Sequence, residues 1–178
     1  MQKGCIQLYY GDGKGKTTAA VGQIVRSVGH GFKVLVYQFL KEPNSGEVSV
    51  LKSLPGVEYI ENEGEIPFMF NLTPEQQEFY KEKFQKTFNI VREKFFSGKY
   101  DLVVLDEVID AYNLDTVPKE QILEMMDKKP ENTELVITGH QYGMDISELT
   151  KRADYVTNFV KEKHPFDLGM PCRKGIEE

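Results

Sequence analysis

The feature that most constrains this chain is a glycine-rich segment near its start, which reads Gly11-Asp12-Gly13-Lys14-Gly15-Lys16-Thr17-Thr18. It lies between a short apolar run, residues 5–10, and a stretch with helical periodicity, residues 16–28, that ends at Gly29. In a strand-loop-helix unit of this kind, backbone N–H groups converge on phosphate oxygens and the helix N-terminus adds partial positive charge. The segment therefore predicts a polyphosphate site.

Two side chains of this segment have the chemistry that a polyphosphate needs. Lys16 supplies a full positive charge, and the hydroxyl of Thr17 can hold Mg²⁺. The usual spacing, G-x-x-x-x-G-K-[ST], would require glycine at position 10, where this chain has Tyr10, so the loop is a variant. The alternative is an ordinary glycine-rich turn with a lysine, but the flanking strand and helix favour the phosphate loop. We expect Lys16 to be exposed at the start of its helix.

The chain is acidic, with a formal net charge of -6 over 178 residues. Proteins that bind nucleic acid usually present a basic face, so this balance argues against nucleic acid as a partner. No run approaches the ~18 apolar residues of a membrane span and no signal-like segment opens the chain, so we expect a cytoplasmic protein with no membrane partner. Cys5 and Cys172 form no C-x-x-C pair, which argues against a disulfide scaffold and a zinc cluster.

Short apolar runs alternate with helix-like stretches along the chain. The predicted strands are residues 5–10, 33–39, 57–60, 102–106, 134–138 and 155–160. Several are apolar without strict alternation, as expected for strands that are covered on both faces of a parallel sheet. The class is therefore α/β. With the phosphate loop, it predicts a three-layer P-loop NTPase (RecA-like) fold with a mostly parallel central sheet of about six strands, in one domain over residues 1–178.

Helix signals fill the intervals between these strands. Thr73 and Pro74 provide a capping hydroxyl and a first-turn proline for a long helix that ends at Gly98. An apolar stripe at steps of three and four residues predicts the face that packs on the core: Tyr80, Phe84, Phe88, Val91 and Phe95. Further helices are predicted over residues 118–128 and 145–153, whereas residues 41–53, 61–71 and 163–178 are predicted to be loops or irregular.

The predicted strand at residues 102–106 ends in two carboxylates, Asp106 and Glu107. At the carboxyl edge of a parallel sheet these acids share a crevice with the phosphate loop, which is where open α/β folds bind ligands. They can organise a magnesium ion that offsets the charge of a triphosphate, so an acidic protein can still bind ATP. The alternative is that the two acids merely end a strand.

Several segments, in this order, resemble a known family. They are GDGKGKTTAA from Gly11, Arg26 with the VGHG run that follows it, VYQFLK from Val36, LVVLDE from Leu102, Thr138-Gly139, Asp145-Ile146, and KHPFDLG from Lys163. Together they cover nearly the whole chain from Cys5 onward and resemble the ATP:corrinoid adenosyltransferases of the P-loop type. The resemblance implies a transferase that moves the 5′-deoxyadenosyl group of ATP to the Co(I) centre of a corrinoid and releases triphosphate, in adenosylcobalamin synthesis or salvage.

The same resemblance implies roles for individual residues. The nucleotide would be held by Gly11, Asp12, Gly13, Lys14, Gly15, Lys16, Thr17, Thr18 and Arg26. Lys16, Thr17 and Glu107 would be catalytic, and Thr17, Glu107 and Asp106 would hold Mg²⁺. Arg26 reads equally well as a solvated helix residue. The resemblance also implies a homodimer and a flavoprotein reductant as electron donor.

Three departures from the family pattern stand out. The family has a phenylalanine and, two residues later, a tryptophan in the loop that displaces the lower cobalt ligand, whereas this chain has no tryptophan. Phe68 and Phe70 have the same spacing and are the candidates for corrinoid contact, with ordinary core packing as the alternative. Asp12 stands where the family often has asparagine, and His140 stands where it commonly has arginine.

Two other classes of function remain open at this point. A P-loop ATPase or small-molecule kinase would use Glu107 to polarise the attacking group. A module that binds corrinoid or nucleotide without catalysis is the second alternative. The products from ATP distinguish these classes, because adenosyl transfer releases triphosphate whereas the rivals release ADP or nothing.

Overall fold

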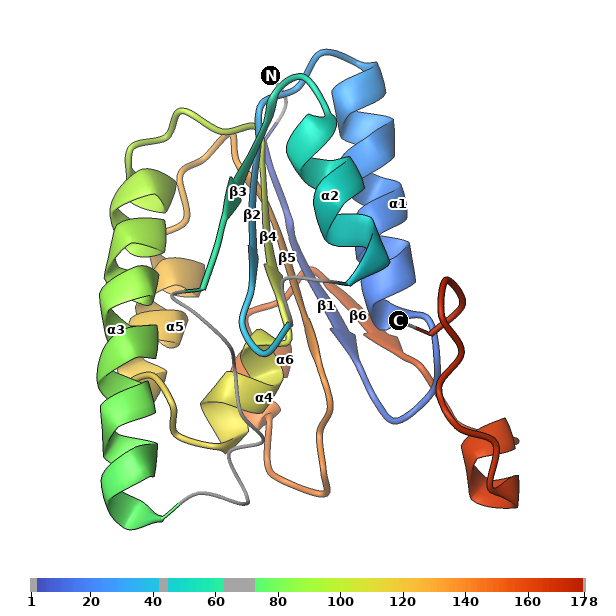
Figure 1. The fold of residues 1–178 in the computed structure, drawn as a ribbon. Coiled ribbons are helices and arrows are strands. Elements are labelled where there is room, and N and C mark those ends of the chain that lie inside the picture. The colour runs from blue at the N-terminus through green and yellow to red at the C-terminus, as the bar shows by residue number, and fades with distance from the viewer. Residues whose placement is uncertain (1–2, 42–44, 63–72, 178) are drawn as a thin grey trace.

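The computed structural model describes residues 3–41, 45–62 and 73–177. Its centre is a six-stranded sheet in the order β3-β2-β4-β5-β1-β6, in which every neighbouring pair is parallel (Figure 1). The strands are β1 (Ile6–Tyr10), β2 (Val34–Gln38), β3 (Val57–Ile60), β4 (Leu102–Asp106), β5 (Glu134–Gly139) and β6 (Tyr155–Asn158). The predicted α/β class and the parallel sheet of about six strands are confirmed.

Helices cover both faces of this sheet, which gives three layers (Figure 1). On one face lie α1 (Lys16–Gly29) and α2 (Gly46–Ser53), and on the other lie α3 (Pro74–Phe96), α4 (Val108–Asn113), α5 (Lys119–Asp127) and α6 (Ser147–Thr150). Two buried clusters correspond to the two faces. Ala20 and Ile24 of α1 pack with Val104 of β4, whereas Phe88 of α3 belongs to the larger cluster with Leu105.

The long helix α3 follows its sequence signals closely. Thr73 forms a capping box with Gln76, and Pro74 occupies the first turn. Four of the five stripe residues are buried, namely Phe84, Phe88, Val91 and Phe95, and Tyr80 packs against the same cluster while partly exposed. The chain leaves the helix through Gly98 at φ 66°, a backbone conformation that glycine adopts without strain.

The structure corrects three predictions of local structure. Residues 41–53 were expected to form a loop, but α2 occupies Gly46–Ser53 because Val48 and Leu51 bury their side chains beside the sheet. The helix predicted over residues 145–153 is confined to Ser147–Thr150. The tail contains a 3-10 turn at Pro165–Leu168, and α4 was not predicted at all.

The parallel sheet brings the ends of five separate segments to one edge. Because all strands run the same way, the residues after β1, β2, β4, β5 and β6 emerge at the carboxyl edge, together with the start of α1 (Figure 1). In the part of the chain that the structure describes, no helix is both long and apolar enough to cross a membrane.

Candidate functional site

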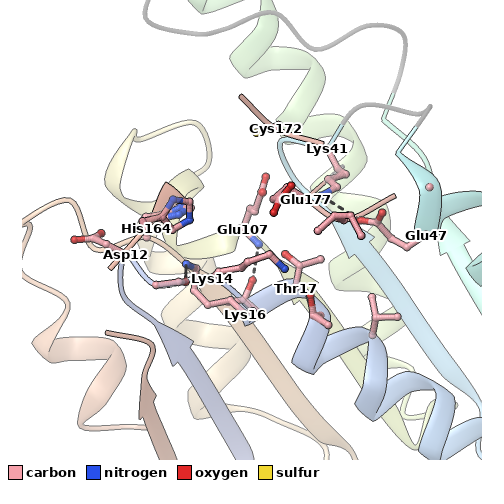
Figure 2. Close-up of a pocket in the computed structure, with 18 of the residues that line it drawn as sticks. Asp12, Lys14, Lys16, Thr17, Lys41, Glu47, Glu107, His164, Cys172 and Glu177 are labelled. Carbon is pink, nitrogen blue, oxygen red and sulfur yellow. Dashed lines mark hydrogen bonds and ion pairs between the residues drawn. The ribbon is translucent and has the colours of Figure 1, made fainter. Parts of the chain in front are cut away.

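A cavity of about 740 Å³ opens at the carboxyl edge of the sheet, within the usual size range of ligand pockets (Figure 2). The phosphate loop and the start of α1 form its floor. Its other walls come from the segment after β2, from the ends of β4 and β5, and from the tail. The lining residues are Asp12 to Thr18, Val21, Lys41, Gly46, Glu47, Glu107, Thr138, His140, His164, Cys172, Gly175, Ile176 and Glu177.

The phosphate loop packs so closely on the segment after β6 that two of its positions exclude a side chain. A Cβ on Gly11, which has φ 109°, would lie 2.3 Å from Oδ1 of Asn158. A Cβ on Gly13 would lie 2.7 Å from the carbonyl oxygen of Phe159, to which the Gly13 N–H donates at 2.7 Å. The loop is therefore held by backbone contacts. No side chain caps the start of α1, where Gly15 is the N-cap, so its first N–H groups are free to meet an anion.

Lys16 is buried, contrary to the expectation that it would be exposed. It is 7% exposed, and its Nζ donates to the carbonyl oxygens of Gly11 at 2.6 Å and Gly13 at 3.0 Å. The side chain folds back under its own loop because these carbonyls satisfy the ammonium group. Burial lowers the pKa of Lys16, although the nearby carboxylates of Asp110 and Asp12 oppose this. The ammonium group thus lies against the backbone of its own loop, which lines the cavity.

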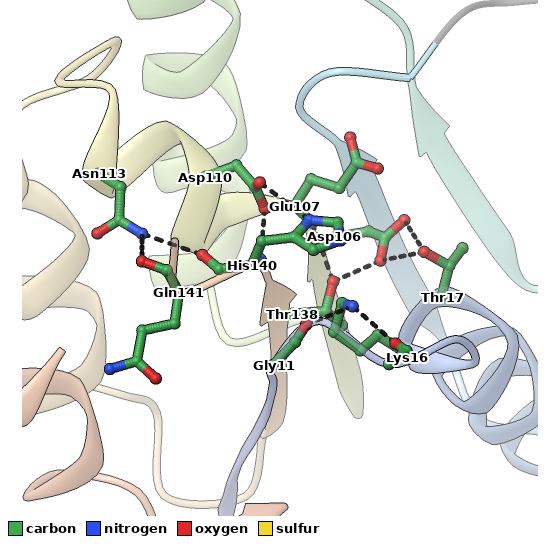
Figure 3. Close-up of polar contacts among 11 residues, drawn as sticks. Gly11, Lys16, Thr17, Asp106, Glu107, Asp110, Asn113, Thr138, His140 and Gln141 are labelled. Carbon is green, nitrogen blue, oxygen red and sulfur yellow. Dashed lines mark hydrogen bonds and ion pairs between the residues drawn. The ribbon is translucent and has the colours of Figure 1, made fainter. Parts of the chain in front are cut away.

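Asp106 connects four elements of the site, and Figure 3 shows its contacts with Thr17 and Thr138. Its carboxylate is 1% exposed and accepts hydrogen bonds from the Thr17 hydroxyl at 3.1 and 3.2 Å, from Nε2 of Gln38 at 2.9 Å and from the Thr138 hydroxyl at 2.6 Å. These donors belong to α1, β2 and β5. A buried carboxylate needs such partners, and here they fix it against the start of α1.

Glu107 has a left-handed backbone conformation and a side-chain pKa that is raised above its ordinary value. It has φ 60°, a left-handed conformation, and its N–H donates to the Thr138 hydroxyl at 3.0 Å. Burial, with the charge of Asp106 as the next cause, raises the pKa of Glu107 to about 7. Left-handed backbone at a non-glycine residue is costly and is often found at functional sites. The carboxyl group lines the cavity and is poised to change charge near neutrality.

Sequence reasoning missed Lys41, a further cation at the cavity besides Lys14 and Lys16. Nζ of Lys41 lies 3.1 Å from Oε1 of Glu47, and both residues line the cavity (Figure 2). Burial by itself lowers the pKa of Lys41, but the carboxylates of Glu47 and Glu107 raise it overall. The available signal was the position of Lys41 just after β2, because every strand of a parallel sheet ends at the same edge.

The tail supplies a wall that sequence reasoning also missed. Residues His164, Cys172, Gly175, Ile176 and Glu177 line the cavity across from the phosphate loop. The guanidinium group of Arg173 donates to the Glu177 carboxylate at 2.7 and 3.1 Å, which closes a local turn. The tail was predicted to be irregular, and nothing in its residue pattern placed it over the loop.

The structure brings most of the predicted residues together. The predicted loop residues from Asp12 to Thr18 and Glu107 line one cavity, Gly11 lies directly beneath it, and Asp106 contacts Thr17. Arg26 is not among them: it is exposed in the last turn of α1, about 15 Å along the helix from Lys16. Phe68 and Phe70 lie outside the described residues.

The donor set at the start of α1 suits one metal in particular. Among the described residues, no group of three or more His, Cys, Asp and Glu side chains is arranged to hold a metal ion. Mg²⁺ usually binds through one or two protein ligands together with water and substrate phosphates, rather than in an all-protein cage. The Thr17 hydroxyl and the Asp106 carboxylate, already in contact, therefore fit a magnesium ion that arrives with a nucleotide.

Comparisons with known proteins identify relatives of this chain. The family described as ATP:corrinoid adenosyltransferase BtuR/CobO/CobP matches residues 2–177. The Corrinoid adenosyltransferase of Escherichia coli (strain K12) is 34% identical over 178 residues, covering 99% of this chain and 86% of the relative. Corrinoid adenosyltransferase CobA of Salmonella typhimurium is 33% identical with the same coverage, and the Corrinoid adenosyltransferase of Pseudomonas aeruginosa is 30% identical, covering 99% of this chain and 84% of the relative.

Solved structures support the fold alone. EssC (ATPases 2 and 3) from Geobacillus thermodenitrificans superposes with a TM-score of 0.55 at 14% identity, over 97% of this chain and 35% of that chain. The cytoplasmic domain of EssC gives a TM-score of 0.54 at 16% identity, over 98% of this chain and 37% of that chain. Both likenesses agree with the predicted P-loop NTPase fold.

Proposed function

This chain belongs to the family of ATP:corrinoid adenosyltransferases BtuR/CobO/CobP, and from that premise we propose how its site performs the reaction. The enzyme transfers the 5′-deoxyadenosyl group of ATP to the cobalt of a corrinoid. The electron pair of Co(I) forms the bond to C5′, the bond between C5′ and the phosphate oxygen breaks, and its electrons leave with triphosphate. Co(I) is a strong nucleophile, so the reaction needs alignment and stabilisation of the leaving group more than it needs a general base.

The phosphate loop is proposed to hold the triphosphate. The backbone from Lys14 to Thr18 lines the cavity at the start of α1, and Lys14 and Lys16 bring two positive charges. Negative charge grows on the triphosphate as the C5′–O bond breaks, so these groups act more strongly on the transition state than on bound ATP. Lys16 must then exchange the carbonyls of Gly11 and Gly13 for phosphate oxygens, a movement of the side chain alone.

Magnesium is proposed to bind beside the loop. The Thr17 hydroxyl and the Asp106 carboxylate would be its ligands, with Glu107 on the cavity side. When bound, the ion would supply positive charge that offsets the negative charge of the triphosphate. Gln38 and Thr138 hold Asp106 in place by hydrogen bonds, and so orient the carboxylate for the metal.

The corrinoid would lie at the open side of the cavity. Phe68 and Phe70 are proposed to contact it and to exclude water from the cobalt, since apolar side chains there favour loss of the lower ligand. A second proposal concerns assembly: the chain forms a homodimer, in support of which β6 is an edge strand whose four residues are all exposed, Tyr155 and Val156 among them. Unpaired apolar edge strands invite pairing with another chain.

The remaining proposals concern the setting of the reaction. Residues 1–178 are proposed to act as one nucleotide-binding unit, because one cavity is lined by the phosphate loop near the start of the chain, by the ends of central strands and by the tail. The enzyme is proposed to work in the cytoplasm, where ATP is available, with a flavoprotein reductant that supplies the electron for Co(I).

The observation that carries the proposal is that the phosphate loop, Lys16 and Thr17 line one cavity and that Thr17 is hydrogen-bonded to Asp106. Its test is to mix the protein with Mg-ATP and a chemically reduced corrinoid and to follow the cobalt spectrum and the phosphate products. Adenosylcorrinoid and triphosphate in equal amounts are expected. ADP with phosphate would instead indicate an ATPase or kinase, and binding without turnover would indicate a non-catalytic module.

A further inference from the structure

A buried carboxylate outside the phosphate loop organises one corner of the cavity. Asp110 of α4 is 2% exposed, and its Oδ2 accepts the backbone N–H of His140 at 2.9 Å while its Oδ1 lies 3.2 Å from Nδ1 of the His140 ring. A Cβ on Gly139, which has φ 151°, would lie 2.3 Å from Oδ2 of Asp110. Only glycine fits between β5 and this carboxylate, so the corner is built around the contact between Asp110 and His140.

Two further contacts fix the histidine. The ring of Tyr142 stacks on that of His140 with centroids 5.1 Å apart and planes inclined by 22°. The Asn113 side-chain amide donates to the carbonyl oxygens of His140 at 3.0 Å and Gln141 at 3.2 Å (Figure 3). Main chain and ring are thus both held, which gives the imidazole one orientation rather than several.

The fixed ring is part of the proposed triphosphate cavity. His140 lines it together with Lys16, Thr138 and Glu107, and its side chain is 36% exposed. Because an ionised carboxylate only accepts, Nδ1 carries a proton toward Asp110. Within the described part of the chain, the His140 ring makes its hydrogen bond through Nδ1. Its other nitrogen, Nε2, is therefore available to a ligand.

We propose that His140 binds the triphosphate of the nucleotide through Nε2, and that Asp110 is the positioning residue that holds the ring for this contact. The inference rests on the proposed function, in which this cavity holds ATP. A ring that donates from Nδ1 to a carboxylate and from Nε2 to a phosphate carries both protons. His140 then acts as a cation between two anions, in addition to the lysines that line the same cavity.

The charges around the ring determine how this contact responds to pH. Asp110 contacts the ring, Tyr142 stacks on it and Glu107 interacts with it electrostatically, while Asp12, Lys14, Lys16, His164 and Glu177 line the same cavity. Binding of an anion at Nε2 takes up a proton when the free ring is neutral, so affinity should fall as pH rises. An arginine at the same position would keep its charge at every pH.

The test uses inorganic tripolyphosphate, titrated calorimetrically into the full-length protein with magnesium. We expect His140→Gln to weaken binding about tenfold, the usual effect of losing a hydrogen bond to a charged group. His140→Arg should restore affinity to within about threefold of wild type. Asp110→Asn should weaken binding in the same direction as His140→Gln. His30→Gln is the matched control, since His30 is exposed at the far end of α1 and should change nothing.

A pH series separates charge from simple packing. As pH rises, wild-type affinity should fall more steeply than that of His140→Arg, because arginine keeps its charge whereas an imidazole can lose a proton. Melting temperatures of all variants are measured alongside. Equal slopes in the two proteins would overturn the proposal, even if His140→Gln binds weakly.

The outcomes distinguish this inference from the proposed function. If wild type binds tripolyphosphate, Lys16→Ala does not, and His140→Gln binds as wild type, the phosphate-loop assignment stands and the role of His140 is wrong. If wild type itself does not bind, both proposals fail. Weakened binding in His140→Gln, restored in His140→Arg, is the result that supports the contact.

Discussion

The cavity has two walls that differ in how they are held. The wall at the sheet edge, with Asp106 and Thr17, is buried and tied by hydrogen bonds to three elements of the fold. The tail wall, with Cys172 and Glu177, rests mainly on a turn that Arg173 closes. The first wall can stabilise charge because its dipoles are fixed before the ligand arrives. The second has the features of a segment that adjusts to the ligand.

The largest effect on adenosyl transfer is expected from the phosphate loop, which forms the floor of the cavity. Lys16→Ala should abolish detectable adenosyl transfer, since the charge that meets the leaving triphosphate is lost. The measurement is the initial rate of triphosphate release under saturating reduced corrinoid. Lys33→Ala is the matched control, because Lys33 is exposed just before β2, at the opposite edge of the sheet. Near-normal turnover in Lys16→Ala would show that the loop does not hold the triphosphate.

A smaller but still large effect is expected from the first wall itself. Asp106→Asn keeps the shape of the side chain but turns one acceptor into a donor toward Thr17 and Gln38. Transfer should fall roughly a hundredfold and unfolding free energy by about 1–3 kcal/mol, as expected for a buried network left partly unsatisfied. Steady-state kinetics and urea unfolding check the two parts. A variant as stable and as active as wild type would remove Asp106 from the site.

Glu107 follows Asp106 in the wall at the sheet edge, and its raised pKa gives a third way to test this wall. Because the folded-state pKa of Glu107 is raised to about 7, the folded protein holds this proton more tightly than the unfolded chain does, and stability falls as pH rises from about 4.5 to about 7. Glu107→Gln removes this loss, so without ligands its melting temperature at pH 8 should exceed that of wild type by roughly 7–14 °C. Near pH 4 the two proteins should melt together. The opposite sign at pH 8 would contradict burial as the cause.

The smallest effect is expected at the second wall. Deletion of residues 172–178 should raise the KM for ATP about threefold and leave kcat and the melting temperature near their wild-type values, because the tail adds contacts to the ligand but little to the core. Glu177→Gln provides the matched point variant within the tail. A large loss of kcat on deletion would mean that the two walls are not separable.

The positions of the predicted site residues show how far sequence reasoning reaches. Residues of the phosphate loop and the pair that follows β4 were identified because their spacing reflects local backbone geometry and strand direction. Lys41, Glu47 and the tail residues were not assigned to the site, although Lys41 and His164 lie in segments that carry the family resemblance, since their place at the cavity depends on how distant segments pack. Arg26 also belongs to a recognisable segment, but the length of α1 places it away from the cavity, and its role in nucleotide binding stays a prediction.

The sequence by itself determined the elements of the sheet, the helix that follows the phosphate loop, the capped start of α3 and the family. These features are local, because hydrophobic period, glycine placement and capping residues act over a few positions. Only the tertiary structure decided that Lys16 is buried, that Asp110 holds His140 at the cavity and that the tail forms a wall. Each of these depends on contacts between distant segments, and such contacts are selected by packing of the whole chain rather than by any one segment.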